Sequence, residues 1–229
     1  MGMTFIQGNF RFEIIDEKEK TVKIMQKDHD TEYNGKLMIP SSVEHEGKTY
    51  SIVEIGGEIL RITTEYKRVV DRRRKGGYRE ESYVQSRYIH GFGDTKISEI
   101  VIPSSCKRIG SSAFQECSYL KKVSIPGTVS IIDSHAFWLC INLEKIIIHD
   151  GVKRIENDAF SGCKIKKISI PASVDTISYD AFRRCEELKE VIIDDSDGII
   201  SISETAFKDC PKCKIKYKSQ MGFFGKLFH

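Results

Sequence analysis

The sequence predicts a solenoid, a fold in which one short unit of chain is repeated and stacked as successive coils. The phrase Ala-Phe-x-x-Cys begins at positions 113, 136, 159, 181 and 206, at steps of 23, 23, 22 and 25 residues. A nearly constant step in this range is typical of stacked repeats. Apolar runs precede the copies, and four of these runs end in Ile-Pro or Ile-His: SEIVIP, KKVSIP, EKIIIH and KKISIP. Each coil is therefore expected to contribute one short parallel strand.

The aligned copies assign each apolar position of the repeat to the core. They share the pattern L-x-x-V-x-I-P-x-x-V-x-x-I-x-x-x-A-F-x-x-C. Val123 and Ile125 alternate with Ser124 as in a strand with one buried face, and the proline that follows ends the pairing. The end of the repeat predicts two buried columns, one of Phe114, Phe137, Phe160, Phe182 and Phe207 and one of Cys117, Cys140, Cys163, Cys185 and Cys210.

The repeat pattern also extends toward the amino terminus, so that residues 36–217 are assigned to about seven coils. The first coil is expected to begin at Leu37 and to carry an insertion near residues 44–52. It is expected to end at Ile59 and Leu60, which stand in place of Ala-Phe, with Thr63 in the cysteine position.

A degenerate second coil is expected between this one and the first Ala-Phe-x-x-Cys phrase. It would begin at Tyr66, carry an insertion near residues 72–82, and end at Gly91 and Phe92, one ordinary step before Ala113. Both insertions would follow the strand of their coil, and we expect them to project from one edge of the solenoid.

The two ends of the chain lie outside the repeat. Within residues 1–35, apolar residues alternate on both sides of the polar turn DEKEK and predict a β-hairpin that caps the first coil. Such a cap is needed because an uncovered terminal coil exposes apolar core. Residues 218–229 include the phenylalanine-rich segment GFFGKLFH, which is expected to cover the last coil, with attachment to a membrane surface as the alternative.

Composition is that of a globular protein and does not indicate a class of partner. The 229 residues are 40% hydrophobic and 30% charged, with a formal net charge of +3. No apolar run reaches the ~18 residues that a membrane-spanning helix requires. The first residues lack the pattern of a secretory signal, which indicates a cytoplasmic protein for the chain as given and a secreted or surface protein if a signal has been removed. The oligomeric state stays open.

The seven cysteines are interpreted as structural thiols. Five share one position of the repeat, and stacked strands lie ~4.8 Å apart, a spacing at which disulfides are also feasible. An odd number of cysteines and the lack of a signal favour reduced side chains. Cys210 and Cys213 form a single CxxC pair without a second pair or spaced histidines, so neither a metal site nor a cofactor is expected.

The repeat resembles the BspA-like leucine-rich repeats, the class that includes the Treponema pallidum leucine-rich repeat proteins. The resemblance covers residues 36–217 and rests on Ile-Pro after the strand and Ala-Phe-x-x-Cys near the end of each coil. It implies an α/β-type leucine-rich repeat solenoid: a curved right-handed superhelix of 22–23-residue coils with one parallel β-sheet on the concave face. It also implies a non-catalytic binding protein, with adhesion and host or matrix proteins as partner classes.

Catalytic chemistry finds little support in the sequence, and no catalytic residue is assigned. The six histidines are scattered, at positions 29, 45, 90, 135, 149 and 229, and none recurs with a carboxylate or thiol at matching repeat positions. His149 stands where other coils have proline. The acidic cluster of Asp194, Asp195 and Asp197 is interpreted as a solvated turn, with a calcium site as the alternative.

A polyanion site is the alternative to a protein-binding face. The second insertion carries the basic run RRRKGGYR, with Arg72, Arg73, Arg74, Lys75 and Arg79 as candidate phosphate contacts. Acidic residues flank this run, and the net charge is far below that of dedicated nucleic-acid-binding proteins. Nucleic acid is therefore not the expected partner.

The outward-facing positions of the strands predict the binding surface. One column comprises Glu99, Lys122, Lys145, Lys167 and Glu190, and its neighbour comprises Val101, Ser124, Ile147, Ser169 and Ile192. Apolar side chains beside a lysine column on the concave face indicate a protein-binding surface. An acidic protein is the expected partner, although exposed lysines are often only solvated.

Overall fold

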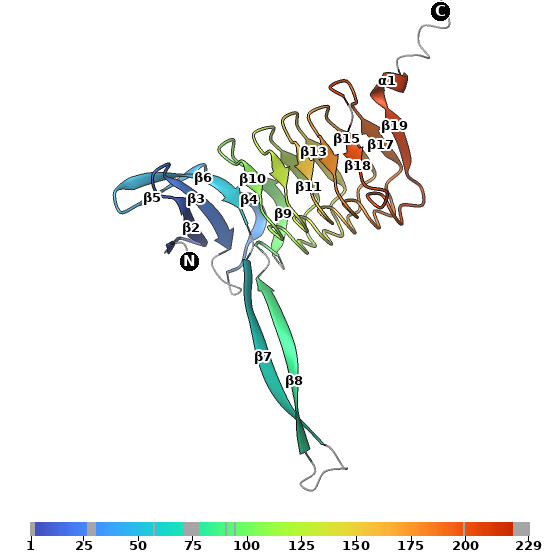
Figure 1. The fold of residues 1–229 in the computed structure, drawn as a ribbon. Helices are drawn as coiled ribbons and strands as arrows, with labels where there is room; N and C mark the ends of the chain where they lie inside the picture. Colours follow the sequence, from blue (N-terminus) through green and yellow to red (C-terminus); the bar gives the residue numbers. More distant parts are fainter. Residues whose placement is uncertain are drawn as a thin grey trace, which may run out of the picture. The chain divides into compact units, whose positions relative to one another are not determined.

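The computed structural model describes residues 3–26, 31–56, 58–70, 78–89, 91–93, 95–198 and 200–221. These residues form two compact units, one of residues 58–89 and the other of the remaining chain. Strands make up nearly all of the regular structure that is described, with the four-residue helix α1 (Lys218–Met221) as the exception (Figure 1). No described helix is long and apolar enough to cross a membrane.

The predicted stack of parallel strands is confirmed, in two sheets rather than one. The first sheet has the order β13–β11–β9–β4 and comprises β4 (Asn34–Met38), β9 (Lys96–Val101), β11 (Lys122–Ile125) and β13 (Lys145–Ile148). The second comprises β15 (Lys167–Ile170), β17 (Glu190–Ile193) and β19 (Lys214–Tyr217). β13 and β15 lie side by side without a shared ladder. We call the outward side of these seven strands the sheet face.

A second parallel ladder, absent from the sequence prediction, holds the coils together on another side. It comprises the two-residue strands β10 (Arg108–Ile109), β12 (Ile131–Ile132), β14 (Arg154–Ile155), β16 (Thr176–Ile177) and β18 (Ser201–Ile202). β14 pairs with β16, so this ladder continues across the break between β13 and β15. The interrupted first ladder is tolerated because these strands and the turns still connect the coils. Two residues are too few for alternation to reveal a strand.

The predicted hairpin cap is present at the amino terminus. β1 (Thr4–Gln7), β2 (Phe10–Asp16) and β3 (Thr21–Gln26) pair antiparallel in that order, and β3 continues in parallel onto β6 (Lys48–Ile55) of the first coil. The side chains of Val22 and Ile24 are fully buried. The hairpin therefore closes the apolar core at this end of the solenoid.

The expected second coil, beginning at Tyr66, was wrong. Tyr66 lies in β7 (Glu58–Val70), which pairs antiparallel with β8 (Tyr78–Ile89) as a separate hairpin unit. Ile59 is also part of β7 and does not end the first coil. A hairpin strand has the same two-residue alternation as a coil strand, so the pattern could not distinguish them.

Gly91 and Phe92 do end a coil, but it is the coil that begins at Leu37. The Phe92 amide donates to the Ala113 carbonyl at 2.7 Å, as the Phe114 amide donates to the Ala136 carbonyl at 2.8 Å. This coil contains two hairpins, β5 (Ser42–His45) with β6 and β7 with β8. The second follows Ile55 at the end of β6, so the expectation that both insertions follow the coil's first strand was also wrong.

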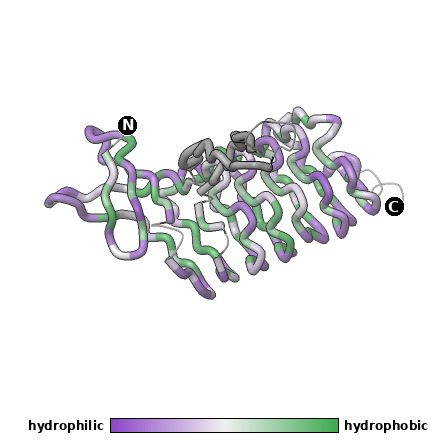
Figure 2. The backbone as a smooth tube through the Cα atoms, turned by 90° about the horizontal axis from the view of Figure 1, so that it is seen from below, coloured by the Kyte–Doolittle hydropathy of each residue, from purple (hydrophilic) through white to green (hydrophobic). Residues whose placement is uncertain are grey.

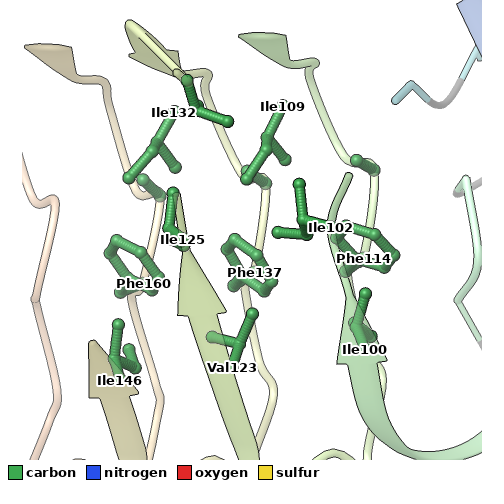
Figure 3. Close-up of a cluster of buried hydrophobic side chains, with 14 of the residues drawn as sticks. Ile100, Ile102, Ile109, Phe114, Val123, Ile125, Ile132, Phe137, Ile146 and Phe160 are labelled. Atoms are coloured by element: carbon green, nitrogen blue, oxygen red, sulfur yellow. The ribbon is translucent and has the colours of Figure 1, made fainter. Parts of the chain in front are cut away.

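The phenylalanine rings form one column through the coils (Figure 3). The centroids of adjacent rings from Phe92 to Phe207 are 5.2–5.5 Å apart, and the ring planes are nearly parallel. The rings of Phe10 and Tyr33 contact Phe92 edge-on and end the column. Phe92, Phe114, Phe137, Phe160 and Phe182 are fully buried, and Phe207 is half-buried. Hydrophobic segments recur from coil to coil in Figure 2.

The repeat cysteines connect each coil to the one before it. Every such thiol donates to the carbonyl of the phenylalanine in the preceding coil. Cys140 Sγ donates to Phe114 O at 3.1 Å, and Cys163 Sγ donates to Phe137 O at 3.2 Å. Burial raises the pKa of the Cys140 and Cys163 thiols. Cys117, Cys140, Cys163 and Cys185 are buried, whereas Cys210 is half-buried. None of the seven cysteines, all within the described residues, forms a disulfide.

Candidate functional site

The sheet face results from strict alternation in the strands. In β11 and β13, Val123 and Ile146 point into the core, while Lys122, Ser124 and Lys145 are exposed. Core packing of one side of each strand holds the outward side chains in fixed columns.

The predicted partner-binding residues lie on this face, but in two groups. In the four-stranded sheet, Glu99, Lys122 and Lys145 are in register, as are Val101, Ser124 and Ile147. In the three-stranded sheet, Lys167 pairs with Glu190, and Ser169 with Ile192. The registered column that the sequence predicts therefore stops between Lys145 and Lys167. The half-buried members are Glu99, Val101, Glu190 and Ile192.

Each of the two sheets has one cluster in which two lysines bind one glutamate. Glu99 lies 3.1 Å from the ammonium of Lys122 and 3.4 Å from that of Lys36. The hydrogen bond from Lys122 lowers the pKa of Glu99.

The second cluster has the same composition. Glu190 accepts from Lys167 and Lys216, both at 2.5 Å. These two ammonium groups, Lys167 first, lower the pKa of Glu190 to about 2. Each cluster therefore keeps a net charge of +1 at neutral pH.

Lys145 lies between these clusters and differs from its neighbours. Within the described residues it forms no ion pair, and its side chain is exposed. Ile147, two residues later on the same side of β13, is 42% exposed. An unpaired cation thus lies beside an apolar side chain that is open to water.

A depression of about 440 Å³ lies on this part of the face. Glu99, Val101, Lys122, Ser124, Lys145, Ile147 and His149 contribute to its lining. Ser124 Oγ and His149 Nε2 are 3.0 Å apart and hydrogen-bonded. The sequence analysis placed Ser124 in an outward column but did not place His149 in a binding site; the signal was the replacement of proline by His149 at one coil's strand end.

The serine–histidine pair has no carboxylate that orients the histidine within the described part of the chain. A catalytic pair of this kind needs a third group that orients the histidine and donors that stabilise an oxyanion. Among the described residues, no hydrogen bond joins the His149 ring to a carboxylate, and both side chains are exposed. The pair is suited to hydrogen bonding with a ligand.

Two carboxylates of the acidic cluster near residue 195 already accept hydrogen bonds from residues of α1. Asp194 accepts from Lys218 at 2.6 Å, and Asp195 accepts from the amide of Ser219 at 2.9 Å. The hydrogen bond from Lys218 lowers the pKa of Asp194. A hydrogen bond from the Ser219 hydroxyl lowers the pKa of Asp195. Across the described residues, no group of three or more potential ligands could hold a metal ion. The cluster ties α1 to the last coils.

The basic candidates can be placed only in part. Arg72, Arg73, Arg74 and Lys75 lie outside the described residues. Arg79 belongs to β8, in register with Val69 of β7.

The sequence matches the family model for the BspA type leucine rich repeat region in six copies over residues 85–214. No curated protein sequence matches the chain. Among solved structures, a Treponema pallidum leucine rich repeat protein is similar with a TM-score of 0.63 and 20% identity, over 94% of this chain and 84% of that one.

Two further solved structures are longer than this chain. A leucine-rich repeat protein from Bacteroides ovatus has a TM-score of 0.60 and 22% identity, and the match covers 93% of this chain and 52% of that one. The pneumococcal vaccine antigen PcpA has a TM-score of 0.52 and 17% identity, over 86% and 51%. This chain therefore spans about half the length of either protein, and these likenesses concern the fold. With the family model matching more than half of its residues, the chain belongs to the BspA-type leucine-rich repeat family.

Proposed function

We propose that the chain is a non-catalytic scaffold that binds a partner protein on the sheet face. One observation carries this proposal: lysines and apolar side chains are held there in registered columns, with Ile147 exposed beside Lys145. Hydrogen-bonded strands with buried inner sides lose little conformational freedom on binding, which favours association.

The partner that suits this face is an acidic protein. Each lysine–glutamate–lysine cluster carries a net charge of +1, and Lys145 adds a third positive charge between them. A complementary negative surface would be attracted and oriented by these charges. Adhesion to host or matrix proteins follows from the family resemblance and is part of the proposal.

A double charge reversal tests the face. The full chain, immobilised, would capture proteins from extracellular matrix and, separately, from a lysate of the source cell, and the enriched protein would be identified and its affinity measured. Lys145→Glu with Lys167→Glu should lower that affinity by at least about tenfold, because two attractions become repulsions.

The matched control reverses two lysines near the other ladder. Lys107 and Lys153 are exposed and form no ion pair within the described residues. Lys107→Glu with Lys153→Glu changes the net charge equally and should leave the affinity unchanged. Equal losses in both variants would contradict a site on the sheet face. Binding that survives both reversals and fails on deletion of residues 72–79 would assign the interaction to the basic insertion, the polyanion alternative.

A further inference from the structure

We propose that the depression around Lys145 is a carboxylate-binding site that receives an acidic side chain, with an adjacent apolar side chain, from an extended segment of the partner. This inference rests on the proposed function and names the chemistry recognised at one place on the sheet face.

Lys145 supplies the charge. Glu99 and Glu190, the acidic members of the predicted column, are each already held by two other lysines. The four-stranded sheet places Lys122 next to Lys145, so two ammonium groups lie on adjacent strands. Since Lys122 is bound to Glu99, Lys145 is the cation available to an incoming carboxylate.

Two departures from the flanking coils, Ile147 and His149, lie beside Lys145 in this one coil. Lys145, Ile147 and His149 are two residues apart, so strand alternation puts them on the same side. The flanking coils have Ser124 and Ser169 at the position of Ile147, and Pro126 and Pro171 at the position of His149. This coil therefore presents an apolar side chain and a hydrogen-bonding ring where its neighbours present serine and proline, next to a lysine that all three coils share.

The Ser124–His149 pair always keeps one donor for a ligand. If His149 Nε2 accepts a hydrogen bond from the Ser124 hydroxyl, Nδ1 carries the ring proton and can donate a hydrogen bond to the ligand. If Nε2 instead donates to Ser124 Oγ, the serine hydroxyl proton can be donated. A carboxylate at Lys145 would thus receive both a charged and a neutral hydrogen bond.

The dimensions suit side chains of a peptide. A volume of about 440 Å³ accommodates one acidic and one apolar side chain, and the parts of Ile147 and Val101 that reach the depression offer the apolar contact. Charge complementarity determines the occupant: with Glu99 neutralised, an acidic segment is attracted and a basic one is repelled.

Methyl NMR of the full chain tests the site with a defined probe. The probe is the blocked peptide acetyl-Gly-Leu-Glu-Leu-Gly-amide, and its isostere has Gln in place of Glu. We expect the Glu peptide to shift the Ile147 methyl signals with a dissociation constant of about 1 mM or tighter, and the Gln peptide to bind at least about tenfold more weakly.

Two variants separate the contributions of Lys145 and His149 to peptide binding. Lys145→Gln should weaken the Glu peptide by at least about tenfold and remove its advantage over the Gln peptide, whereas Lys153→Gln should have no effect. His149→Phe keeps a ring without donors and should weaken binding by a smaller factor. Methyl spectra that otherwise match the unmodified protein show that each variant is folded.

Several results would overturn the inference. These are equal affinity for the two peptides, no loss in Lys145→Gln, or no Ile147 shift at millimolar peptide. If the partner's affinity nevertheless depends on Lys145 and Lys167 in the double reversal, the proposed function stands and only the carboxylate site is lost. If neither dependence is found, both proposals are contradicted.

Discussion

The regular coils from Ile100 to Phe182 and the first coil from Leu37 to Thr95 have the same interior but very different lengths of chain. In the regular coils, about 23 residues lead from one Ala-Phe phrase to the next. The first coil contains two hairpins, yet Phe92 stacks on Phe114 at 5.5 Å, much as Phe114 stacks on Phe137 at 5.3 Å. A coil is therefore defined by a few inward-pointing residues, and the chain between them can be extended freely.

The cysteine position shows how the first coil adapts to having no coil before it. In the regular coils, the thiol donates to the phenylalanine carbonyl of the preceding coil. In the first coil Thr95 occupies this position and donates to the carbonyl of Phe92 in its own coil at 2.7 Å. The hydroxyl is buried and paired locally, as a terminal coil requires.

Truncation of the stacked rings should produce the largest effect. Phe160→Ala should lower the free energy of unfolding by ~3–5 kcal/mol, because it removes a fully buried ring and leaves a cavity between two others. Phe92→Ala should cost a similar amount if the first coil is an equal member of the stack. Urea unfolding followed by circular dichroism measures both. A much smaller loss for Phe92→Ala would show that the first coil is only loosely joined to the column.

Replacement of a bridging thiol should have an intermediate effect. Cys140→Ala should destabilise by about 1–2 kcal/mol, since it loses volume and the hydrogen bond to the Phe114 carbonyl. Cys140→Ser retains a donor and should cost less than alanine. The comparison uses the same unfolding measurement, and a serine variant less stable than the alanine variant would contradict a bonding role for the thiol.

Removal of the long hairpin should have the smallest effect. Glu58 and Ile89 are paired in β7 and β8, so replacing residues 58–89 with Gly-Ser-Gly joins two neighbouring points of the chain. Because this hairpin is a separate compact unit, we expect the free energy of unfolding of the solenoid to change by less than about 1 kcal/mol. Thermal unfolding of the shortened and full chains provides the test. A loss comparable to that of Phe160→Ala would mean that the hairpin contributes to the core.

Sequence periodicity was a reliable guide where the unit is repeated without interruption. The strands containing Val123, Ile146 and Ile168 lie where the Ile-Pro and Ile-His runs predict them. The same reasoning failed at Tyr66, because alternation in a free hairpin matches alternation in a coil. It also missed Thr95 as the counterpart of the repeat cysteines, since the intervening hairpins remove the constant step.

The sequence predicted which side of the strands carries the candidate site, but not the ion pairs within it. Alternation alone placed Lys122, Lys145 and Ile147 on the outward side of their strands. The ion pairs of this site were not predicted: Glu99 binds Lys36 of β4 as well as Lys122, and Glu190 binds Lys216 of β19 as well as Lys167.

By itself, the sequence determined the coil, its core and its outward face. Each of these depends on the spacing of apolar residues within about one repeat, which can be read directly from the sequence. Only the tertiary structure decided that Glu99 and Glu190 each hold two lysines, that Lys145 has no ion pair among the described residues, and that Ser124 meets His149 of the next coil. Those contacts join residues 23 to 63 positions apart, and they arise from the side-by-side packing of strands whose register no single coil specifies.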